Sequence, residues 1–290
     1  MQQKKKYKVR GHESFCIREG WLSKGLHAVR ENPKVFTKSQ GADVLGVGTN
    51  MVKSIRYWLK VTGLTVEQTG KGMHLTEFGE LVYRYDPYME EIFTLWCLHL
   101  NIVEQAELAT SWYLFFSDFM LEEFKREDVE EFLRNELEKY TMQEEINARA
   151  IREDCTVLLQ MYARDPQKEL DPEDKMNSPL EKLGIIRKNG QIYRRVQPDL
   201  ERFPEEIVCY LLQGIWKDTT ALNIDNFYHG PLGVYKTLGL SMSAYQDCLA
   251  ILERKEYIDI NRTAGLDMIY KKQELTREEV ARRYYEAREI

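Results

Sequence analysis

The sequence lacks the residue patterns by which many enzymes and membrane proteins are recognised. Its 290 residues contain no Gly-rich phosphate loop, no Gly-x-Gly-x-x-Gly segment after a strand and no His-Glu-x-x-His pair. The five cysteines are spaced singly, without a Cys-x-x-Cys pair, which argues against a zinc ribbon and a thioredoxin-like redox centre. There is no apolar run of about 18 residues or more, as a membrane span would need. The basic start, residues 1–6, has no apolar stretch of a secretory signal after it. We expect a cytoplasmic, non-enzymatic protein without metal or cofactor.

The sequence also has fewer basic than acidic side chains, 41 against 47. The net charge of −6 argues, by itself, against a nucleic-acid-binding protein. The acidic excess is local, however, because residues 118–150 contain eleven acidic side chains against five basic ones. Residues 38–76 contain five basic side chains against two acidic ones. The average over the chain therefore hides a modest basic face.

Residues 38–83 have the order of elements typical of a winged helix-turn-helix. The predicted elements around this segment are helices over 18–31, 35–45 and 51–61, strands over 64–68 and 73–75, and a helix over 77–85. Thr49 and Thr76 are suited to cap the helices that follow them. Such a unit chiefly places one helix in a DNA groove.

The helix over 51–61 is predicted to present a polar face to double-stranded DNA. Its candidate contacts, with the wing, are Asn50, Lys53, Ser54, Arg56, Tyr57, Lys60, Lys71 and His74. Lysine and arginine neutralise phosphates, so we assign Lys53, Arg56 and Lys60 to the backbone. Asn50 or Tyr57 would lie near base edges. The alternative is a winged-helix module used for protein contacts.

The rest of the chain predicts a mainly α fold with small β-wings, in which two winged helix-turn-helix units bracket a helical middle. The domain boundaries expected are 1–85, 86–165 and 166–290. Aromatic residues of the middle recur at helical spacing, which is typical of a core and not of base-stacking platforms. The second winged unit is predicted from helices over 205–216, 231–237 and 243–255, wing strands over 257–262 and 267–271, and a last helix over 276–289. Its outward helix is less basic, which favours protein contact.

A hairpin with Asn189-Gly190 at its turn forms a second basic feature. Its positive side chains are Arg187, Lys188, Arg194 and Arg195. The polar stretch over 164–179 before it, which contains three prolines, is predicted to be a linker or long loop.

The N-terminal stretch Gly11-His12-Glu13-Ser14-Phe15, followed by Arg18-Glu19-Gly20-Trp21-Leu22-Ser23-Lys24-Gly25, carries a cluster of polar residues. His12, Glu13, Arg18 and Lys24 are therefore candidate site residues; alternatively, Arg18 and Glu19 solvate a helix while Gly20 and Gly25 permit packing. The segment 8–15 is predicted to be extended, which would put His12 and Glu13 on opposite faces. No oxyanion hole accompanies them, so we expect no catalysis there.

Together with Leu45-Gly46-Val47-Gly48-Thr49-Asn50-Met51-Val52-Lys53-Ser54-Ile55-Arg56-Tyr57-Trp58-Leu59, this opening resembles the bacterial family called domain of unknown function 4007. The resemblance covers nearly the whole chain. Members look like companions of DNA phosphorothioation and related phage-defence genes, beside sulfurtransferases similar to phosphoadenosine-phosphosulfate reductase and cysteine desulfurases. The resemblance implies a DNA-binding accessory protein and supplies no catalytic residues. The alternatives are a scaffold that docks a sulfurtransferase of the same locus and a transcriptional regulator of that locus.

Overall fold

The fold is mainly α-helical with small β-sheets, as the sequence predicts. The computed structural model describes residues 5–37, 40–142, 146–164, 177–216, 219–263 and 266–288. Over these ranges the strands form sheets of two, four and three strands, paired antiparallel except for one parallel pair. None of the helices described there has the length and apolar content that crossing a bilayer requires.

The N-terminal part consists of α1 (Trp21–Glu31), α2 (Gln40–Leu45), α3 (Thr49–Val61), β1 (Thr65–Gln68), β2 (Gly72–Leu75) and α4 (Glu77–Tyr85). The first helix begins three residues later than predicted, because Gly20 adopts a left-handed conformation with φ of 76°. The second is shorter than predicted, since 33–37 form turns; Lys38, where we placed the start of the unit, lies outside the described residues. Of the two predicted caps, Thr76 is confirmed: its Oγ1 accepts a hydrogen bond of 2.9 Å from the Gly79 amide. The prediction is wrong for Thr49, because α3 begins at Thr49 itself, after Gly48, without a side-chain cap.

Glycine at position 79, inside α4, is required by packing. A Cβ atom there would lie 2.0 Å from the carbonyl oxygen of Leu64, the residue just before β1. This close approach seats α4 against the chain that leads into the β1–β2 hairpin.

The middle part comprises α5 (Ile92–Val103), α6 (Thr110–Asp118), β3 (Glu123–Lys125), α7 (Arg126–Thr141), α8 (Ala148–Tyr162), β4 (Ala163–Arg164), η2 (Pro179–Leu183), β5 (Ile186–Asn189) and β6 (Ile192–Arg195). The Asn-Gly hairpin is confirmed, with Gly190 at φ of 61°. It is not free-standing, however, because β3 and β4 flank it in a four-stranded sheet, β3-β6-β5-β4. Most of the predicted linker, 165–176, lies outside the described residues.

The aromatic residues of the middle part form a core, as predicted. Trp96, Trp112, Phe115 and Phe116 are each at most 1% exposed. Helix α5 is buried on almost all sides, which explains its nearly continuous apolar sequence.

The C-terminal part comprises α9 (Glu206–Ile215), β7 (Ala221–Asn223), α10 (Ile224–His229), α11 (Val234–Leu238), α12 (Met242–Arg254), β8 (Ile258–Thr263), β9 (Leu266–Lys271) and α13 (Arg277–Ala287). The sequence did not predict β7 and α10, because three-residue strands and six-residue helices are too short to show a period. The predicted capping box of the last helix is confirmed by reciprocal hydrogen bonds between Thr276 and Glu279, of 2.6 and 3.1 Å.

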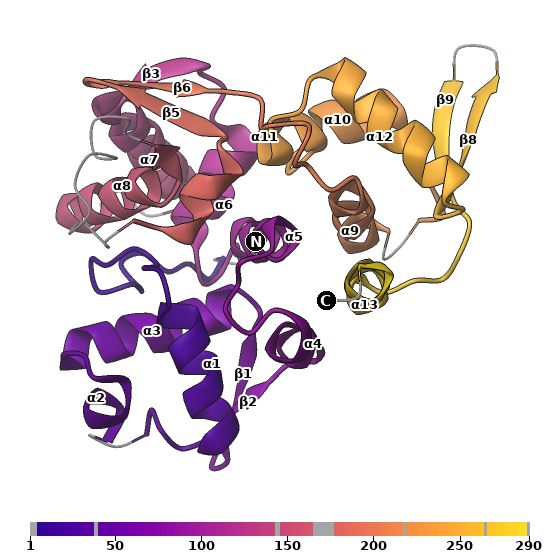
Figure 1. Ribbon diagram of the computed structural model, residues 1–290. Coiled ribbons are helices and arrows are strands. Elements are labelled where there is room, and N and C mark those ends of the chain that lie inside the picture. Colours follow the sequence, from indigo (N-terminus) through magenta and orange to yellow (C-terminus); the bar gives the residue numbers. More distant parts are fainter. Residues whose placement is uncertain are drawn as a thin grey trace.

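The last helix packs against both the N-terminal part and the C-terminal part. In Figure 1, α13 lies beside α4 of the N-terminal part and α9 of the C-terminal part. Arg277 donates two hydrogen bonds, of 2.6 and 2.5 Å, to the Glu104 carboxylate at the end of α5. Tyr284 stacks on Phe93 of α5, with ring centroids 3.9 Å apart. The buried apolar residues of all three parts consequently form one cluster.

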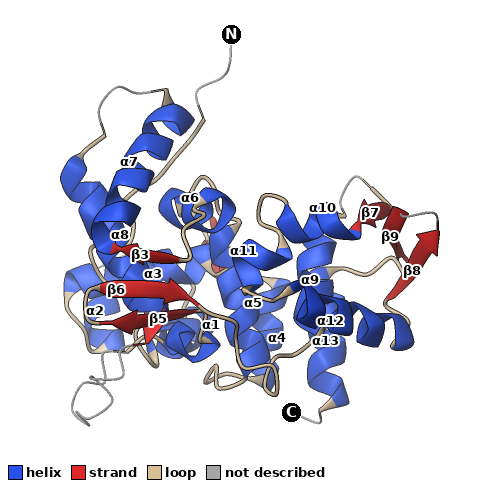
Figure 2. Ribbon diagram, turned by 90° about the horizontal axis from the view of Figure 1, so that it is seen from above, coloured by secondary structure: helices blue, strands red, loops and turns tan. Residues whose placement is uncertain are grey.

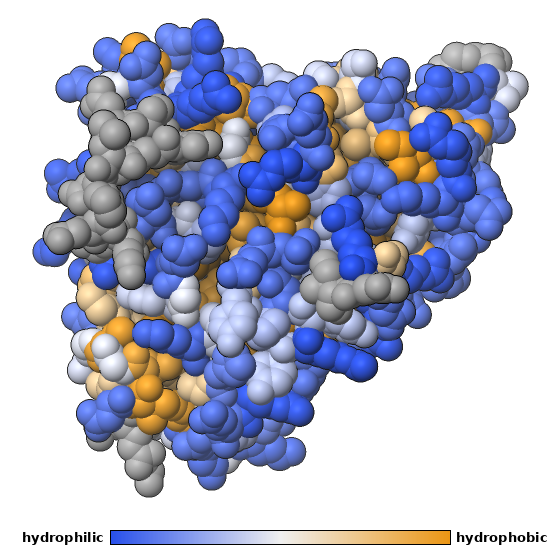
Figure 3. Space-filling model, in the orientation of Figure 1, coloured by the Kyte–Doolittle hydropathy of each residue, from blue (hydrophilic) through white to orange (hydrophobic). Residues whose placement is uncertain are grey.

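The acidic helix α7 and the sheet of the C-terminal part lie at opposite ends of the molecule. Figure 2 shows α7, which packs on α8 and α6, at one side and β7, β8 and β9 at the other. The face in Figure 3 is mostly hydrophilic, and apolar side chains gather over the part where α2 and α3 lie in Figure 1. Val44 of α2 is an exposed apolar residue of this region.

A fully buried histidine connects the middle and C-terminal parts. His99 Nε2 lies 2.9 Å from the carbonyl oxygen of Thr237 on α11, so this nitrogen carries the proton. Its Nδ1 lies 2.9 Å from the hydroxyl of Tyr162, from which it accepts. Burial, reinforced by the positive charge of Arg195, lowers the pKa of His99 to about 4.

This histidine makes stability depend on pH. In the unfolded chain the imidazole has a pKa of about 6.5. Between that pH and about 4, the unfolded chain therefore binds a proton that the native protein does not. The neutral, hydrogen-bonded imidazole should therefore stabilise the fold fully at pH values above the pKa of the unfolded chain. As the pH falls to about 4, the unfolding free energy should decrease by on the order of 3 kcal/mol. We expect the difference in unfolding free energy between wild type and His99→Gln, measured in urea, to shrink with falling pH. A difference independent of pH would contradict this assignment.

Candidate functional site

The predicted DNA-contacting face of α3 is only partly exposed. Asn50 and Lys53, in the first turns of the helix, face solvent, and Lys53 Nζ lies 3.3 Å from Asn50 Oδ1. The prediction is wrong for Ser54 and Tyr57, which are 0% and 8% exposed. The Tyr57 hydroxyl donates to the carbonyl oxygen of Leu108, 2.8 Å away, and burial raises the pKa of this phenol. Helix α3 is covered on more of its circumference than its polar residues suggested.

The two remaining cations of α3 share one carboxylate. Arg56 and Lys60 both pair with Glu67 of β1, and the Lys60 Nζ to Glu67 Oε2 distance is 3.0 Å. The hydrogen bond from Lys60, together with Arg56, lowers the pKa of Glu67. Two positive charges against one negative charge leave this part of the surface basic, but with its phosphate-binding groups already engaged.

The wing contributes one cation to this surface. Lys71 is exposed in the turn between β1 and β2, where Gly70 and Gly72 adopt positive φ values of 76° and 96°. His74 is half-buried and its Nε2 atom is shielded from solvent, so this part of the ring is not presented to a ligand. The exposed basic surface therefore consists of Lys53, Arg56, Lys60 and Lys71 with Asn50; we call it the α3 surface.

The N-terminal motif folds differently from the prediction. Residues 9–14 form turns instead of an extended piece, and Arg10, Glu13 and Ser14 all have positive φ values, of 59°, 51° and 67°. His12, a candidate site residue, is fully buried, with its ring stacked on Trp58 at a centroid distance of 5.9 Å. His12 is therefore a core residue whose ring is not presented at the surface.

A buried carboxylate holds this turn in place. Asp154 of α8 accepts hydrogen bonds from the Arg10 amide at 2.7 Å and from the Ser111 hydroxyl at 2.6 Å. Its Oδ1 lies 2.9 Å from His12 Nε2, while His12 Nδ1 accepts from the Ser14 amide at 3.1 Å. The carboxylate thus ties the N-terminal segment to α6 and α8.

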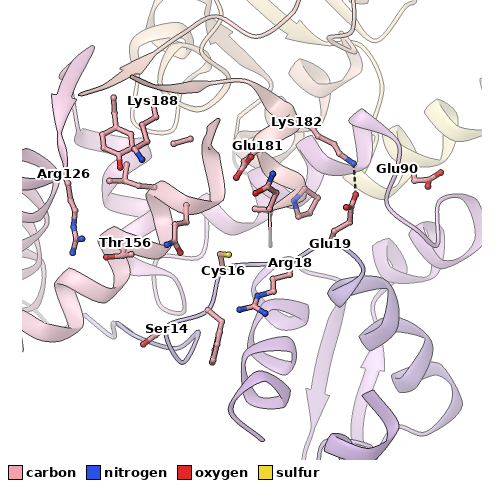
Figure 4. Close-up of a pocket in the computed structure, with 18 of the residues that line it drawn as sticks. Ser14, Cys16, Arg18, Glu19, Glu90, Arg126, Thr156, Glu181, Lys182 and Lys188 are labelled. Carbon is pink, nitrogen blue, oxygen red and sulfur yellow. Dashed lines mark hydrogen bonds and ion pairs between the residues drawn. The ribbon is translucent and has the colours of Figure 1, made fainter. Parts of the chain in front are cut away.

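Immediately after this anchor, the chain enters the wall of a large cavity. The cavity has a volume of about 920 Å³, and residues 14–19 line it together with the start of α7, the middle of α8, η2 and the β5–β6 hairpin. In Figure 4, Arg126, Thr156 and Lys188 lie toward one end of the view, Lys182, Glu19 and Glu90 toward the other, and Cys16 and Arg18 lie between them. The hydroxyls of Ser14, Thr156 and Ser178 add hydrogen-bonding groups.

The cavity is basic although the chain is acidic. Its lining includes two lysines and three arginines, Arg18, Arg126, Lys182, Lys188 and Arg202, against three glutamates, Glu19, Glu90 and Glu181. Among the described residues, Lys182 lies 3.3 Å from Glu19 and Arg126 lies 2.7 Å from Glu130, so both of these cations have a carboxylate partner.

Arg18 is different, because no carboxylate of the described residues pairs with it. Its guanidinium lies 5.1 Å from the Trp21 ring centroid and 5.5 Å from that of Phe15. The other motif candidates lie elsewhere: Lys24 is exposed on α1 outside the cavity lining, and Glu13 lies 3.9 Å from Lys53. The structure therefore separates the four motif residues.

The four basic side chains of the β5–β6 hairpin also lie in different surroundings. Arg194 pairs with Glu123 at 3.2 Å, Arg187 opposite it is exposed, and Lys188 lines the cavity. The prediction of an outward positive charge is wrong for Arg195. Its guanidinium donates to the carbonyl oxygens of Phe115, Phe119 and Lys236, each 3.2 Å away, and burial lowers its pKa to about 10.

Helix α12, which precedes the hairpin of the C-terminal part as α3 precedes β1 and β2, is not basic. Its exposed polar side chains include Gln246, Asp247, Glu253 and Arg254. Lys255, at the end of this helix, pairs with Glu205 and Glu206, each 2.6 Å away.

In the described part of the chain, no three His, Cys, Asp or Glu side chains gather closely enough to hold a metal ion.

The sequence did not predict the cavity. Ser14 to Glu19 lie within the polar motif, which is a signal for this wall, but apart from Glu90 the other lining residues come from position 126 onward, far along the chain. Their juxtaposition depends on the Asp154 anchor and on β3 and β4 flanking the hairpin.

Comparisons with known proteins agree on one family and one fold. The family model described as "Protein of unknown function (DUF4007)" matches residues 9–285. No curated protein matches the chain. Two solved structures, described as "SspB crystal structure" and "Magnesium ion-bound SspB crystal structure", each have a TM-score of 0.81 and 22% sequence identity. Both cover 97% of this chain, which in turn covers 95% and 94% of theirs. At this identity the likeness shows a common fold.

The Asp154 anchor can be tested by removing its carboxylate. In Asp154→Ala, His12 and the Arg10 amide lose a buried partner, and we expect the unfolding free energy to fall by about 3 kcal/mol. Urea denaturation measures this loss. The neighbouring Glu153→Ala is the control: it removes only pairs made with half-exposed or exposed arginines and Ser14, so about 1 kcal/mol or less should be lost. Equal losses in the two variants would show that Asp154 is not the anchor.

Proposed function

The chain belongs to the DUF4007 family, and from its exposed α3 surface we propose that it is a DNA-binding accessory protein of a DNA phosphorothioation or related phage-defence system. The observation that carries the proposal is the polar face of α3, with Asn50 and Lys53 exposed in its first turns and with Arg56 and Lys60 paired to Glu67 of the following hairpin. The link to phosphorothioation rests on the family resemblance of the N-terminal and 45–59 motifs.

We interpret two parts of the chain as winged helix-turn-helix units bracketing a helical middle. In the first, α2 and α3 are joined by a turn with Gly46 at φ of 65°, and the β1–β2 hairpin follows as the wing. In the second, α12 is followed by β8 and β9, which pair with β7 in the order β7-β9-β8. Such units place the helix before the wing in the major groove. Only the first has a net positive exposed face, so we assign DNA binding to it.

The chemistry of the α3 surface suits a phosphate backbone better than a neutral partner. Lysine and arginine contacts to phosphate release counterions, so each contact adds about one unit to the slope of affinity against salt. Arg56 and Lys60 must exchange their pairing with Glu67 for a phosphate. Glu67 therefore acts as an internal competitor, which weakens binding and makes it easily reversed.

This competition predicts opposite effects of two substitutions. Glu67→Gln removes the competing charge, so duplex affinity should rise roughly fivefold at low salt. Lys53→Glu combined with Arg56→Glu should lower affinity at least about tenfold and reduce the salt slope by about two. Fluorescence anisotropy with a random-sequence duplex, with and without phosphorothioate linkages, measures both.

The matched control is Arg254→Glu, which reverses an exposed charge on α12. It should leave duplex binding unchanged. Affinity that survives the double substitution, or that falls equally in the control, would show that α3 is not the DNA-binding helix.

We further propose that the protein binds DNA without cutting it. One of the two solved structures with this fold is described as magnesium-bound, so the assay includes Mg²⁺. Supercoiled plasmid incubated with the protein and Mg²⁺ should shift in a gel and return as supercoiled DNA after the protein is removed. Conversion to nicked circles that depends on Mg²⁺ would overturn the non-catalytic assignment while leaving the binding assignment intact.

A further inference from the structure

We propose that the cavity between residues 14–19, α8, η2 and the β5–β6 hairpin binds a phosphate-bearing ligand of nucleotide size. This site is separate from the α3 surface, and it goes beyond the proposed DNA-binding function. It is built from groups that the sequence assigns to two different features, the N-terminal motif and the basic hairpin.

Charge is the first argument. A chain with a net charge of −6 places five cations against three carboxylates around one hollow. Like charges that line one hollow repel one another, and an anion bound between them relieves this repulsion. The balance of charge therefore indicates an anionic ligand, and a doubly charged phosphate suits it better than a single carboxylate.

Arg18 supplies the second argument. Its guanidinium is half-buried and held near the rings of Phe15 and Trp21, yet it has no carboxylate partner within the described ranges. The adjacent Glu19 does not approach it but pairs with Lys182 across the cavity. A positioned arginine with unused donors is suited to bind two oxygens of a phosphate at once.

Size and the remaining lining favour a nucleotide over inorganic phosphate alone. A volume of about 920 Å³ is near the upper end of the range for small-molecule sites. Tyr193 lines the cavity and stacks on Phe124 at a centroid distance of 5.8 Å, so the wall contains an aromatic ring, the kind of side chain beside which bases pack. Cations at both ends and an aromatic ring in the wall match a ligand that has both phosphate and base.

The hairpin provides a matched pair of variants. Lys188 and Arg187 are neighbours on β5, but successive side chains of a strand point to opposite faces, and only Lys188 lines the cavity. Arg18→Gln and Lys188→Gln remove charges from the cavity, whereas Arg187→Gln removes the same charge from the other face. All three side chains reach solvent, so each variant should keep the thermal unfolding midpoint of the wild type.

Calorimetric titration of the full chain with AMP tests the proposal. Wild type and Arg187→Gln should bind AMP equally, and Arg18→Gln and Lys188→Gln should each weaken binding about tenfold or more. The Lys53→Glu/Arg56→Glu variant should bind AMP like the wild type, which separates this result from the DNA-binding one. Two trinucleotides, one with a 5′-phosphate and one with a 5′-hydroxyl, show whether the phosphate comes from a free nucleotide or from the end of a strand.

Binding of the 5′-phosphorylated trinucleotide in place of AMP, with the same response to Arg18→Gln and Lys188→Gln, would support the site and identify its ligand as the end of a strand. Absence of binding by both probes up to about 5 mM would overturn the proposal. Equal weakening in Arg187→Gln would also overturn it, because the binding would then follow surface charge and not the cavity.

Discussion

The buried carboxylate of Asp154 is the constraint on which the N-terminal half of the structure depends. It accepts from the Arg10 amide and the Ser111 hydroxyl and pairs with His12, so it joins a turn, α6 and α8 at one point. A buried charge of this kind is tolerated only when donors surround it, and these donors are in place only if residues 9–14 adopt their left-handed turns. The same turns direct residues 14–19 into the wall of the cavity and bring Trp58 of α3 against the His12 ring.

Charge in this protein is organised by location. The acidic excess lies in residues 118–150, which include α7, whereas basic side chains gather at the α3 surface and in the lining of the cavity. Each basic surface is partly neutralised from within, by Glu67 at the α3 surface and by Glu19 at the cavity. Such internal pairs keep cations ordered and lower the affinity for any one anion, so both surfaces suit partners that bind and are released.

Much of the fold could be predicted from the sequence because its signals are local. The Thr76 cap, the Thr276–Glu279 capping box and the Asn189-Gly190 turn depend on neighbouring residues, and all three are present. Apart from the Thr49 cap, the failures concern tertiary contacts. Tyr57 donates a hydrogen bond to the distant carbonyl oxygen of Leu108 and is buried, and Arg195 donates to that of Phe115 and is half-buried. His12 is buried for the same reason, since its partner is 142 residues away. The cavity could not be predicted, because its walls meet only after these distant partners have formed.

The most direct measurement of the central claim, that DNA binds the α3 surface of the first winged unit, is amide hydrogen exchange of the full chain with and without duplex. The first amides of a helix and those of a hairpin turn lack local partners and exchange quickly, so they report contact sensitively. On addition of duplex, exchange should slow at the start of α3 and in the β1–β2 turn, with no change in α12, β8 and β9. Protection confined to α12 and the second hairpin, or its absence throughout residues 49–75, would contradict the account.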